Sequence, residues 1–263
     1  RNILSYTLPK PNVFLALVLF SKIIKPFSFI LPQFLRNSLN LMPDKIPSKK
    51  IRTRKIYPSE SKKTVARVAL LIGCVQRVIS PEINESTIRL LNRHDVEVVV
   101  LPKIDCCGSL NHHLGKKKLA HSSFVKNIKL WHEEYLKNGL DAIISNTSGC
   151  GTTLKDYGFI FRNDKELKKK AKKISELTKD ITEYLDENLK LKIKPSNQKK
   201  YKIAYHSACS MQHGQKVHEQ PKNLIEQTGN TVLDIPEGHM CCGSAGTYNI
   251  LHQKTAKSLL KNK

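Results

Sequence analysis

Hydrophobic residues fall into short β-type runs that alternate with helical patterns along most of the chain. Residues 65–72 and 96–101 are nearly continuous apolar runs, which is typical of parallel strands buried on both faces. A helical periodicity of apolar positions predicts helices over 81–93 and 117–137, and another apolar run predicts a third strand over 141–145. Because strands alternate with helices, the pattern predicts an α/β fold of βαβ units with a mostly parallel sheet.

The same order of elements returns near the end of the chain. A short strand is expected at 203–205, a helix at 216–228, a second strand at 232–235 and a last helix after Tyr248. The stretch between the two units, 164–192, carries an apolar stripe among Lys and Glu, which predicts a surface helix pair. We therefore expect two internally repeated βαβ-type domains.

The N-terminal segment has apolar residues with Lys and Arg between them, which predicts amphipathic helices. Pro26 and Pro32 interrupt its apolar stretch, so we do not expect a membrane span of roughly 20 residues. Helices packed on the protein are expected, and a position in a membrane interface is the alternative. Pro, Ser, Lys and Arg without periodicity then mark a linker. The predicted organisation is an amphipathic helical segment at 1–42, a linker at 43–63, a first cysteine-rich domain at 64–195 and a second at 196–263.

Charge narrows the possible partners. Basic residues outnumber acidic ones 45 to 22, which gives a formal net charge of +23. Most of the basic residues are Lys, which is weaker than Arg in bidentate recognition of phosphates and bases, and no nucleic-acid reader motif accompanies them. We expect no nucleic-acid binding; a solvated surface, an acidic partner and anionic lipid headgroups all fit the charge.

Six of the seven cysteines form two sets with the same internal spacing. Cys74 precedes the pair Cys106–Cys107 by as many residues as Cys209 precedes the pair Cys241–Cys242, and a glycine follows each pair. Adjacent cysteines are poorly placed to form a disulfide with each other, so the pattern favours metal ligation in a reducing compartment. We expect a cytoplasmic protein, or one held at the inner face of a membrane.

The remaining cysteine, Cys150, follows the predicted strand at 141–145 and would complete the first set as a fourth thiolate. Its counterpart in the second set would lie past Lys263, so we expect the second domain to be incomplete at its C-terminal end. Soft sulfur ligands at the carboxyl ends of parallel strands favour an iron–sulfur cluster. Structural zinc and thiol redox catalysis remain alternatives, although both normally use Cys-x-x-Cys, which is absent here.

Five histidines lie close to the cysteines in the sequence. Each is a candidate for a ligand, a proton carrier or a hydrogen-bond donor to a ligand, and each is equally compatible with a structural role. They are His112, His113, His206, His213 and His239.

Longer motifs around the cysteines resemble a known family, the cysteine-rich CCG proteins. The family includes the cysteine-rich subunit of heterodisulfide reductase and the iron–sulfur subunits of several two-electron dehydrogenases, and the likeness is strongest to the glycolate oxidase iron–sulfur subunits. It covers nearly all of residues 10–263. The motifs are Gly73-Cys74-Val75-Gln76, Cys106-Cys107-Gly108, His112-His113-Leu114-Gly115, Ser148-Gly149-Cys150-Gly151, Gln212-His213-Gly214-Gln215-Lys216 and Cys241-Cys242-Gly243-Ser244-Ala245-Gly246-Thr247-Tyr248.

The resemblance implies an electron-transfer subunit with a [4Fe-4S]-type cluster, whose ligands would come from the seven cysteines and which would have no catalytic residue of its own. Flavoprotein subunits would oxidise glycolate to glyoxylate, and this subunit would pass the electrons to a quinone or another membrane acceptor. No Gly-x-Gly-x-x-Gly dinucleotide fingerprint occurs here, which agrees with a flavin housed elsewhere. In related subunits a Cys-x-x-Cys closes the pattern, where this chain has Thr147 and Cys150.

Family members also carry an N-terminal ferredoxin-like module, so the resemblance implies a fragment that lacks it. Three alternatives stay open. They are a CCG subunit of a lactate or glycerol 3-phosphate dehydrogenase, a stand-alone enzyme like heterodisulfide reductase, and a scaffold subunit whose cysteines hold zinc.

Overall fold

The main domain is built on a five-stranded sheet with the strand order β1-β3-β2-β4-β5. The computed structural model describes residues 2–33, 36, 39, 42–43, 56–61, 63–104, 106–193, 199–244, 246 and 248–262. The strands of this sheet are β1 (Ile56–Tyr57), β2 (Ala66–Leu71), β3 (Val96–Val99), β4 (Ala142–Ser145) and β5 (Thr178–Asp180). β2 to β5 pair in parallel, and β1 runs antiparallel to β3 at the edge. The predicted α/β fold with a mostly parallel sheet is confirmed.

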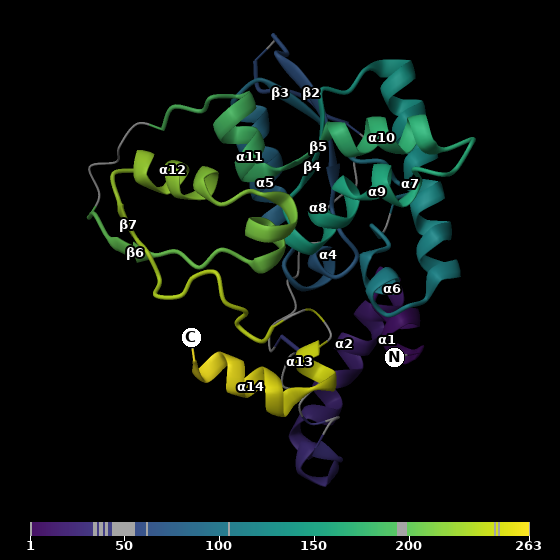
Figure 1. The fold of residues 1–263 in the computed structure, drawn as a ribbon, viewed down its shortest axis with the longest axis vertical. Helices are drawn as coiled ribbons and strands as arrows, with labels where there is room; N and C mark the ends of the chain where they lie inside the picture. The colour runs from purple at the N-terminus through teal and green to yellow at the C-terminus, as the bar shows by residue number, and fades with distance from the viewer. Residues whose placement is uncertain are drawn as a thin grey trace.

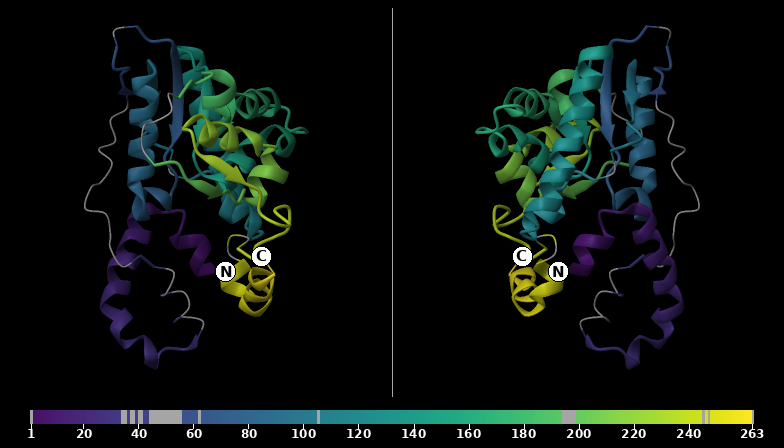
Figure 2. Two further views of the ribbon diagram at one scale, coloured as in Figure 1. Left: turned by 90° about the vertical axis from the view of Figure 1, so that its left-hand side faces the viewer. Right: turned by 90° about the vertical axis from the view of Figure 1, so that its right-hand side faces the viewer.

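Helices cover both faces of this sheet, and this makes three layers (Figure 1; Figure 2). The helices of the main domain are α4 (Gln76–Ile79), α5 (Pro81–Arg93), α6 (Ser109–His113), α7 (Lys117–Asn138), α8 (Ser148–Lys155), α9 (Tyr157–Ile160), α10 (Lys168–Leu177), α11 (Ile181–Glu183) and the π-helical turn η2 (Tyr184–Asn188).

Each face of the sheet has its own hydrophobic core. Ala69 and Leu71 of β2 join the core that contains Phe124, Ile128 and Trp131 of α7. Their neighbours in β2, among them Leu70, join the second core, which includes side chains of α5 and η2. Successive side chains of a strand point to opposite faces, so a strand covered on both sides must be apolar throughout, as the run at 65–72 predicted.

The connection between the two repeats contains a strand that the sequence pattern did not reveal. We expected a helix pair over 164–192, but the chain leaves α10 at Leu177 and forms β5, which pairs in parallel with β4. Thr178 and Asp180 of this strand are buried. Three residues are too few to show an alternating pattern beside the strong helical stripe, so the prediction was wrong here.

The second unit is smaller and repeats the βαβ order. Strands β6 (Lys202–Ala204) and β7 (Thr231–Leu233) pair in parallel in a two-stranded sheet, with α12 (Glu219–Gln227) between them in the sequence. The π-helical turn η3 (Ser210–Gln215) precedes α12, and the chain ends in α13 (Tyr248–Leu251) and α14 (Gln253–Lys261). The expected strand–helix–strand order of the second unit is therefore present.

The N-terminal segment forms α1 (Asn2–Thr7), α2 (Pro11–Ile24) and the 3₁₀ helix η1 (Lys25–Ile30). Phe14 and Val18 of α2 pack against Val78 of α4. The α-helix ends at Ile24, two residues before Pro26, as expected, but the chain continues as a 3₁₀ helix, because a proline early in the first turn of η1 leaves no required N–H unpaired. Residues Pro11–Ile30 form one helical stretch that is long and apolar enough to cross a membrane, and 17% of its most apolar window is buried.

The predicted linker at 43–63 lies largely outside the described residues. Its described part contributes β1, which closes one edge of the main sheet.

Candidate functional site

Sheet topology brings four cysteines to one edge. Cys74 follows β2, Cys106 and Cys107 follow β3, and Cys150 lies in α8 directly after β4. β2 pairs with β3 on one side and with β4 on the other, so the loops that leave these three parallel strands emerge side by side. Ligand sites in open α/β sheets form at this carboxyl edge, where the strand order reverses.

The four thiols form a continuous chain of contacts. The sulfurs of Cys107 and Cys150 lie 3.0 Å apart, and Cys106 is hydrogen-bonded to both Cys107 and Cys74. Cys106 and Cys107 are buried, whereas Cys74 and Cys150 are partly exposed. The structure therefore brings together the first predicted set, including the distant Cys150.

Contacts among the thiols shift the pKa values of Cys74, Cys106 and Cys107 in different directions. Hydrogen bonds from Cys107 and Cys74, together with the Gly108 N–H, lower the pKa of Cys106 to about 3. The hydrogen bond to Cys106, followed by burial, raises the pKa of Cys74, and the pKa of Cys107 is raised well above its ordinary value by its hydrogen bonds to Cys106 and Cys150. Further deprotonation needs a strong positive charge among the sulfurs, and bound metal supplies such a charge.

The four sulfur atoms are of the ligand type that binds an iron–sulfur cluster. Four thiols without a carboxylate ligand suit iron–sulfur chemistry. The described residues contain no group of three or more His, Cys, Asp or Glu side chains set out as ligands of a metal ion. Cys74, Cys106, Cys107 and Cys150 are the residues that would hold such a cluster.

Gly108 shapes the turn that presents the cysteine pair. Its φ is +84°, and a Cβ placed there would lie 2.5 Å from the Phe124 ring, so a side chain is excluded both by backbone conformation and by packing. The close approach lets the Gly108 N–H point at the Cys106 sulfur at 3.4 Å. Gly243 in the second unit has a φ of +80°, an equivalent contact to Cys241 at 3.4 Å, and Ala256 of α14 where Gly108 has Phe124.

Two buried residues hold the backbone of the first cysteine pair. The Asn127 amide donates to the Cys106 carbonyl at 2.8 Å, and the Tyr157 hydroxyl donates to the Cys107 carbonyl at 2.7 Å. Asn127 also donates to the Tyr157 oxygen, which joins the two. Sequence reasoning missed both, although a polar Asn127 on the apolar face of the helix predicted over 117–137 was an available signal.

A polar network ties the Cys74 loop to the Cys150 loop. Gln76 accepts a hydrogen bond from the Thr147 hydroxyl at 2.6 Å and donates to Asn146 and Asn84 at 2.8 and 3.1 Å. Asn84 is fully buried and donates to the Ile72 carbonyl at the end of β2. Thr147 thus works as a link between the two loops.

The second cysteine set is not gathered in the same way. Cys209 begins η3, Cys241 is exposed and Cys242 is partly exposed. Within the described part of the chain, no sulfur–sulfur contact joins Cys209 to Cys241 or Cys242. Their role as ligands stays a prediction.

The Cys209 loop instead packs on the Cys150 helix. A Cβ on Gly151 would lie 2.6 Å from the Gln215 side chain, and a Cβ on Gly214 would lie 2.8 Å from Thr152. Gln215 donates to the Ser148 carbonyl, and Thr152 donates to a carbonyl of η3. The two repeats therefore meet at α8 and η3.

All five candidate histidines are exposed. His112 lies against the Phe124 ring with centroids 5.7 Å apart, and burial, followed by the nearby His112, lowers the pKa of His113. The His213 ring nitrogen lies 3.2 Å from the His239 carbonyl oxygen. Among the described residues no hydrogen bond joins a histidine ring, that of His206 included, to a cysteine sulfur, so a ligand role for them stays a prediction.

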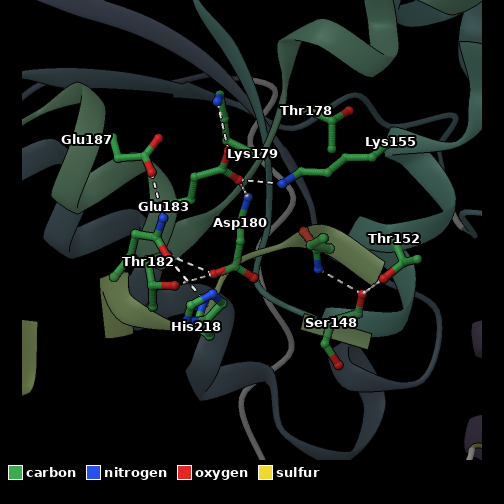
Figure 3. A network of polar contacts seen from close by, with 12 residues as sticks. Ser148, Thr152, Lys155, Thr178, Lys179, Asp180, Thr182, Glu183, Glu187 and His218 are labelled. Atoms are coloured by element: carbon green, nitrogen blue, oxygen red, sulfur yellow. Dashed lines mark hydrogen bonds and ion pairs between the residues drawn. The ribbon is translucent and has the colours of Figure 1, made fainter. Parts of the chain in front are cut away.

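A charged network holds the last residue of α8, Lys155 (Figure 3). Glu183 accepts from Lys155 at 2.6 Å and from Lys179 at 2.8 Å, and its carboxylate also accepts from the Asp180 N–H. Asp180 in turn caps α11 through Thr182. Burial alone would raise the pKa of Glu183, but the two lysines outweigh it and lower that pKa. The network fastens α8 to β5 and α11.

An open pocket of about 600 Å³ lies between the main sheet and the second unit. Asn146, Ser148 and Asp180 line its main-domain side, and Tyr205 and Met211 lie on the other. Burial raises the pKa of Asp180. The pocket borders the first turn of α8, two residues from Cys150.

The sequence matches the profile of the cysteine-rich domain called CCG over residues 68–155 and 203–263, which together make up more than half of the chain. The chain belongs to the CCG cysteine-rich domain family. The two matched stretches contain the two cysteine sets, which agrees with a repeated architecture. They fall inside the predicted domains 64–195 and 196–263, whose outer limits stay a prediction.

Curated relatives of the chain include iron–sulfur proteins of oxidases. It is 34% identical to the glycolate oxidase iron-sulfur subunit of Escherichia coli (strain K12) over 263 residues, which is 100% of this chain and 61% of that protein. It is 27% identical to the probable glycolate oxidase iron-sulfur subunit of Bacillus subtilis (strain 168) over 89% of this chain and 52% of that protein. Lactate utilization protein A of Geobacillus kaustophilus (strain HTA426) is 25% identical over 70% of this chain and 74% of that protein. The chain thus spans between half and two thirds of the length of the two glycolate oxidase relatives.

The Gly108→Ala substitution should destabilise the chain by about 2–4 kcal/mol, because the added methyl group must meet Phe124 from a left-handed backbone conformation. Urea unfolding of the metal-free protein measures this. Gly149→Ala is the matched control, since nothing lies within 4 Å of its added Cβ, and we expect a change below about 1 kcal/mol. Equal losses in both variants would contradict the packing argument.

The Glu183→Gln substitution should cost about 2–4 kcal/mol at neutral pH, because it leaves two lysines without their carboxylate. The folded pKa of Glu183 lies below its ordinary value of 4.5, so the carboxylate stabilises the fold above that pH and loses its contribution as the pH falls through the folded pKa. The difference in unfolding free energy between wild type and variant should shrink below about pH 4.5. Glu176→Gln, at an exposed i,i+4 pair with Lys172, should change stability by less than about 0.5 kcal/mol at every pH. A pH-independent difference for Glu183→Gln would argue against an ionic contribution.

Proposed function

We propose that this chain is the CCG portion of an iron–sulfur subunit of glycolate oxidase, and that it carries electrons rather than binding glycolate. The four touching thiols at the carboxyl edge of the main sheet carry the proposal. The likeness to the Escherichia coli glycolate oxidase iron-sulfur subunit over the whole chain supports the choice of glycolate. A bound [4Fe-4S]-type cluster would supply one-electron transfer at this edge.

The chain's own residues hold and shield that centre. Cys74, Cys106, Cys107 and Cys150 are the proposed ligands, and Asn127 and Tyr157 fix the backbone of the central pair. Gln76 keeps the loops of Cys74 and Cys150 at a set separation through Thr147 and Asn146. With both loops tied to strand ends, little of the protein has to rearrange when the charge of the centre changes, which favours fast electron transfer.

The proposed partners follow from this role. Flavoprotein subunits would oxidise glycolate to glyoxylate and pass electrons to this chain, which would deliver them to a quinone-type acceptor. The proposed location is the cytoplasm, at the inner face of the membrane. A CCG subunit of lactate oxidation is the second candidate, because lactate utilization protein A is similar over 70% of this chain.

Anaerobic reconstitution followed by counting iron and acid-labile sulfide tests the cluster. We expect equal amounts of iron and sulfide in the wild type, a loss of most of the iron in Cys74→Ser, and a smaller loss in Cys209→Ser, whose set is not gathered. Equal losses of the same iron in both variants would indicate one cluster shared between the repeats. Stoichiometric zinc with no sulfide would overturn the proposal in favour of a scaffold.

Reconstitution with flavoprotein subunits tests the reaction. The isolated chain should not reduce a dye with glycolate, and addition of glycolate-oxidising flavoprotein subunits should restore dye reduction that depends on Cys74 and Cys106. L-Lactate tested in parallel separates the two candidate reactions. Glycolate-dependent turnover by the chain alone, without flavin, would contradict the electron-transfer role.

A further inference from the structure

The helical stretch formed by α2 and η1 is apolar on two sides. Its inner side is anchored on the main domain, where Phe14 and Val18 pack on Val78 of α4 and the buried Ser21 hydroxyl donates to the Val18 carbonyl. Its outer side faces away from the sheet at the end of the molecule that carries both termini (Figure 1; Figure 2). A helix that is apolar on both sides requires cover on both.

The outer side carries a continuous apolar stripe. Ala16, Phe20, Ile23 and Phe27 follow one another at intervals of three or four residues, so they share one face of the helical stretch, and Leu19 lies beside them at its edge. Phe20 is 57% exposed, Ile23 68% and Phe27 59%. Scattered exposed apolar residues are ordinary, whereas a contiguous face of this kind marks an interaction surface.

The residues around the apolar stripe are basic, which favours an anionic partner. Residues 1–43 contain no Asp or Glu, Lys22 and Lys25 lie within the helical stretch, and Arg36 follows it. The Arg36 guanidinium donates to the Phe29 carbonyl, which holds this cation at the end of η1. The whole chain has a net charge of +23, so a second copy of the chain would be repelled, while an anionic surface would be attracted. Phenylalanines next to basic residues are typical of helices that lie in a membrane interface.

We propose that the outer face of α2 and η1 binds the surface of an anionic lipid bilayer, with the helical axis in the plane of the membrane. The length and hydropathy of Pro11–Ile30 would also allow a span. The packing argues against it, because a crossing helix would have to withdraw Phe14 and Val18 from the main domain. It would also carry Lys22 into the hydrocarbon layer.

This attachment would set the orientation of the cysteine site. α2 packs on α4, and α4 begins two residues after Cys74. A helix with its side chains is about 10–12 Å thick, so one helical layer would separate the Cys74 loop from the lipid. The attachment does not depend on the proposed cluster or on the substrate of a partner.

Sedimentation of the 263-residue chain with vesicles tests the proposal. We expect binding to vesicles of phosphatidylcholine mixed with phosphatidylglycerol and at least a ten-fold weaker association with phosphatidylcholine alone. The double variant Phe20→Gln, Ile23→Gln should weaken binding to the anionic vesicles at least ten-fold. The matched control Leu136→Gln, Phe159→Gln removes two side chains that are 70% and 66% exposed elsewhere and should bind like the wild type.

The charge is tested separately. Lys22→Gln, Lys25→Gln should weaken binding to the anionic vesicles about ten-fold, since each basic residue near the lipid surface contributes to the attraction. The control Lys168→Gln, Lys169→Gln removes two exposed lysines of α10 and should leave binding within two-fold of the wild type, as an order-of-magnitude bound.

Three results would overturn the proposal. The first is no binding to anionic vesicles at physiological salt, and the second is equal weakening by the outer-face variant and its control. The third is a dimer in light scattering that Phe20→Gln, Ile23→Gln dissolves, since the face would then serve self-association. Iron and sulfide counted on the same samples report on the cluster independently, so a failure to bind membranes leaves the proposed cluster and its electron transfer untouched.

Discussion

Parallel pairing of β2 with β3 on one side and β4 on the other is the constraint on which the site depends. Parallel strands end at the same edge, so three loops that are distant in sequence must emerge together. The near-continuous apolar character of these strands is the cost of burying the sheet on both faces. Everything else at the site refines this arrangement. Asn127 and Tyr157 fix the pair after β3, and Gln76 ties the loop after β2 to the loop after β4.

Much of this arrangement could be predicted from the sequence, because each buried strand and each long helix has a strong period of its own. The helix predicted over 81–93 has those limits in the structure, and the return of the cysteine spacing revealed the repeat. Grouping Cys150 with the first set followed from its position after a strand, and its sulfur indeed touches that of Cys107. Long-range polar pairing could not be foreseen, because nothing in the neighbourhood of Gln76 or Asn127 indicates the partner that folding brings to it.

Short strands and the second cysteine set are the features that the sequence pattern predicts least well. β5 is three residues long and is defined by its pairing with β4 rather than by its own side chains. The second set shares the spacing and the glycine turn of the first, and β6 pairs in parallel with β7 as β2 does with β3, yet in the described residues no sulfur contact joins Cys209 to the pair. The spacing thus predicts the turn at each cysteine pair, but it does not predict whether the sulfurs meet.

The reciprocal fit of Gly151 with Gln215 and of Gly214 with Thr152 has a consequence for how this protein can evolve. Each glycine leaves just the room that a side chain of the other repeat occupies, so neither position can gain a methyl group unless its partner shrinks. Substitutions at these four positions are expected to be tolerated in pairs and rejected singly. Although each repeat carries its own cysteine set, the two repeats must therefore change together at this contact. In a protein that joins repeats from two different relatives, we expect these four positions to clash first.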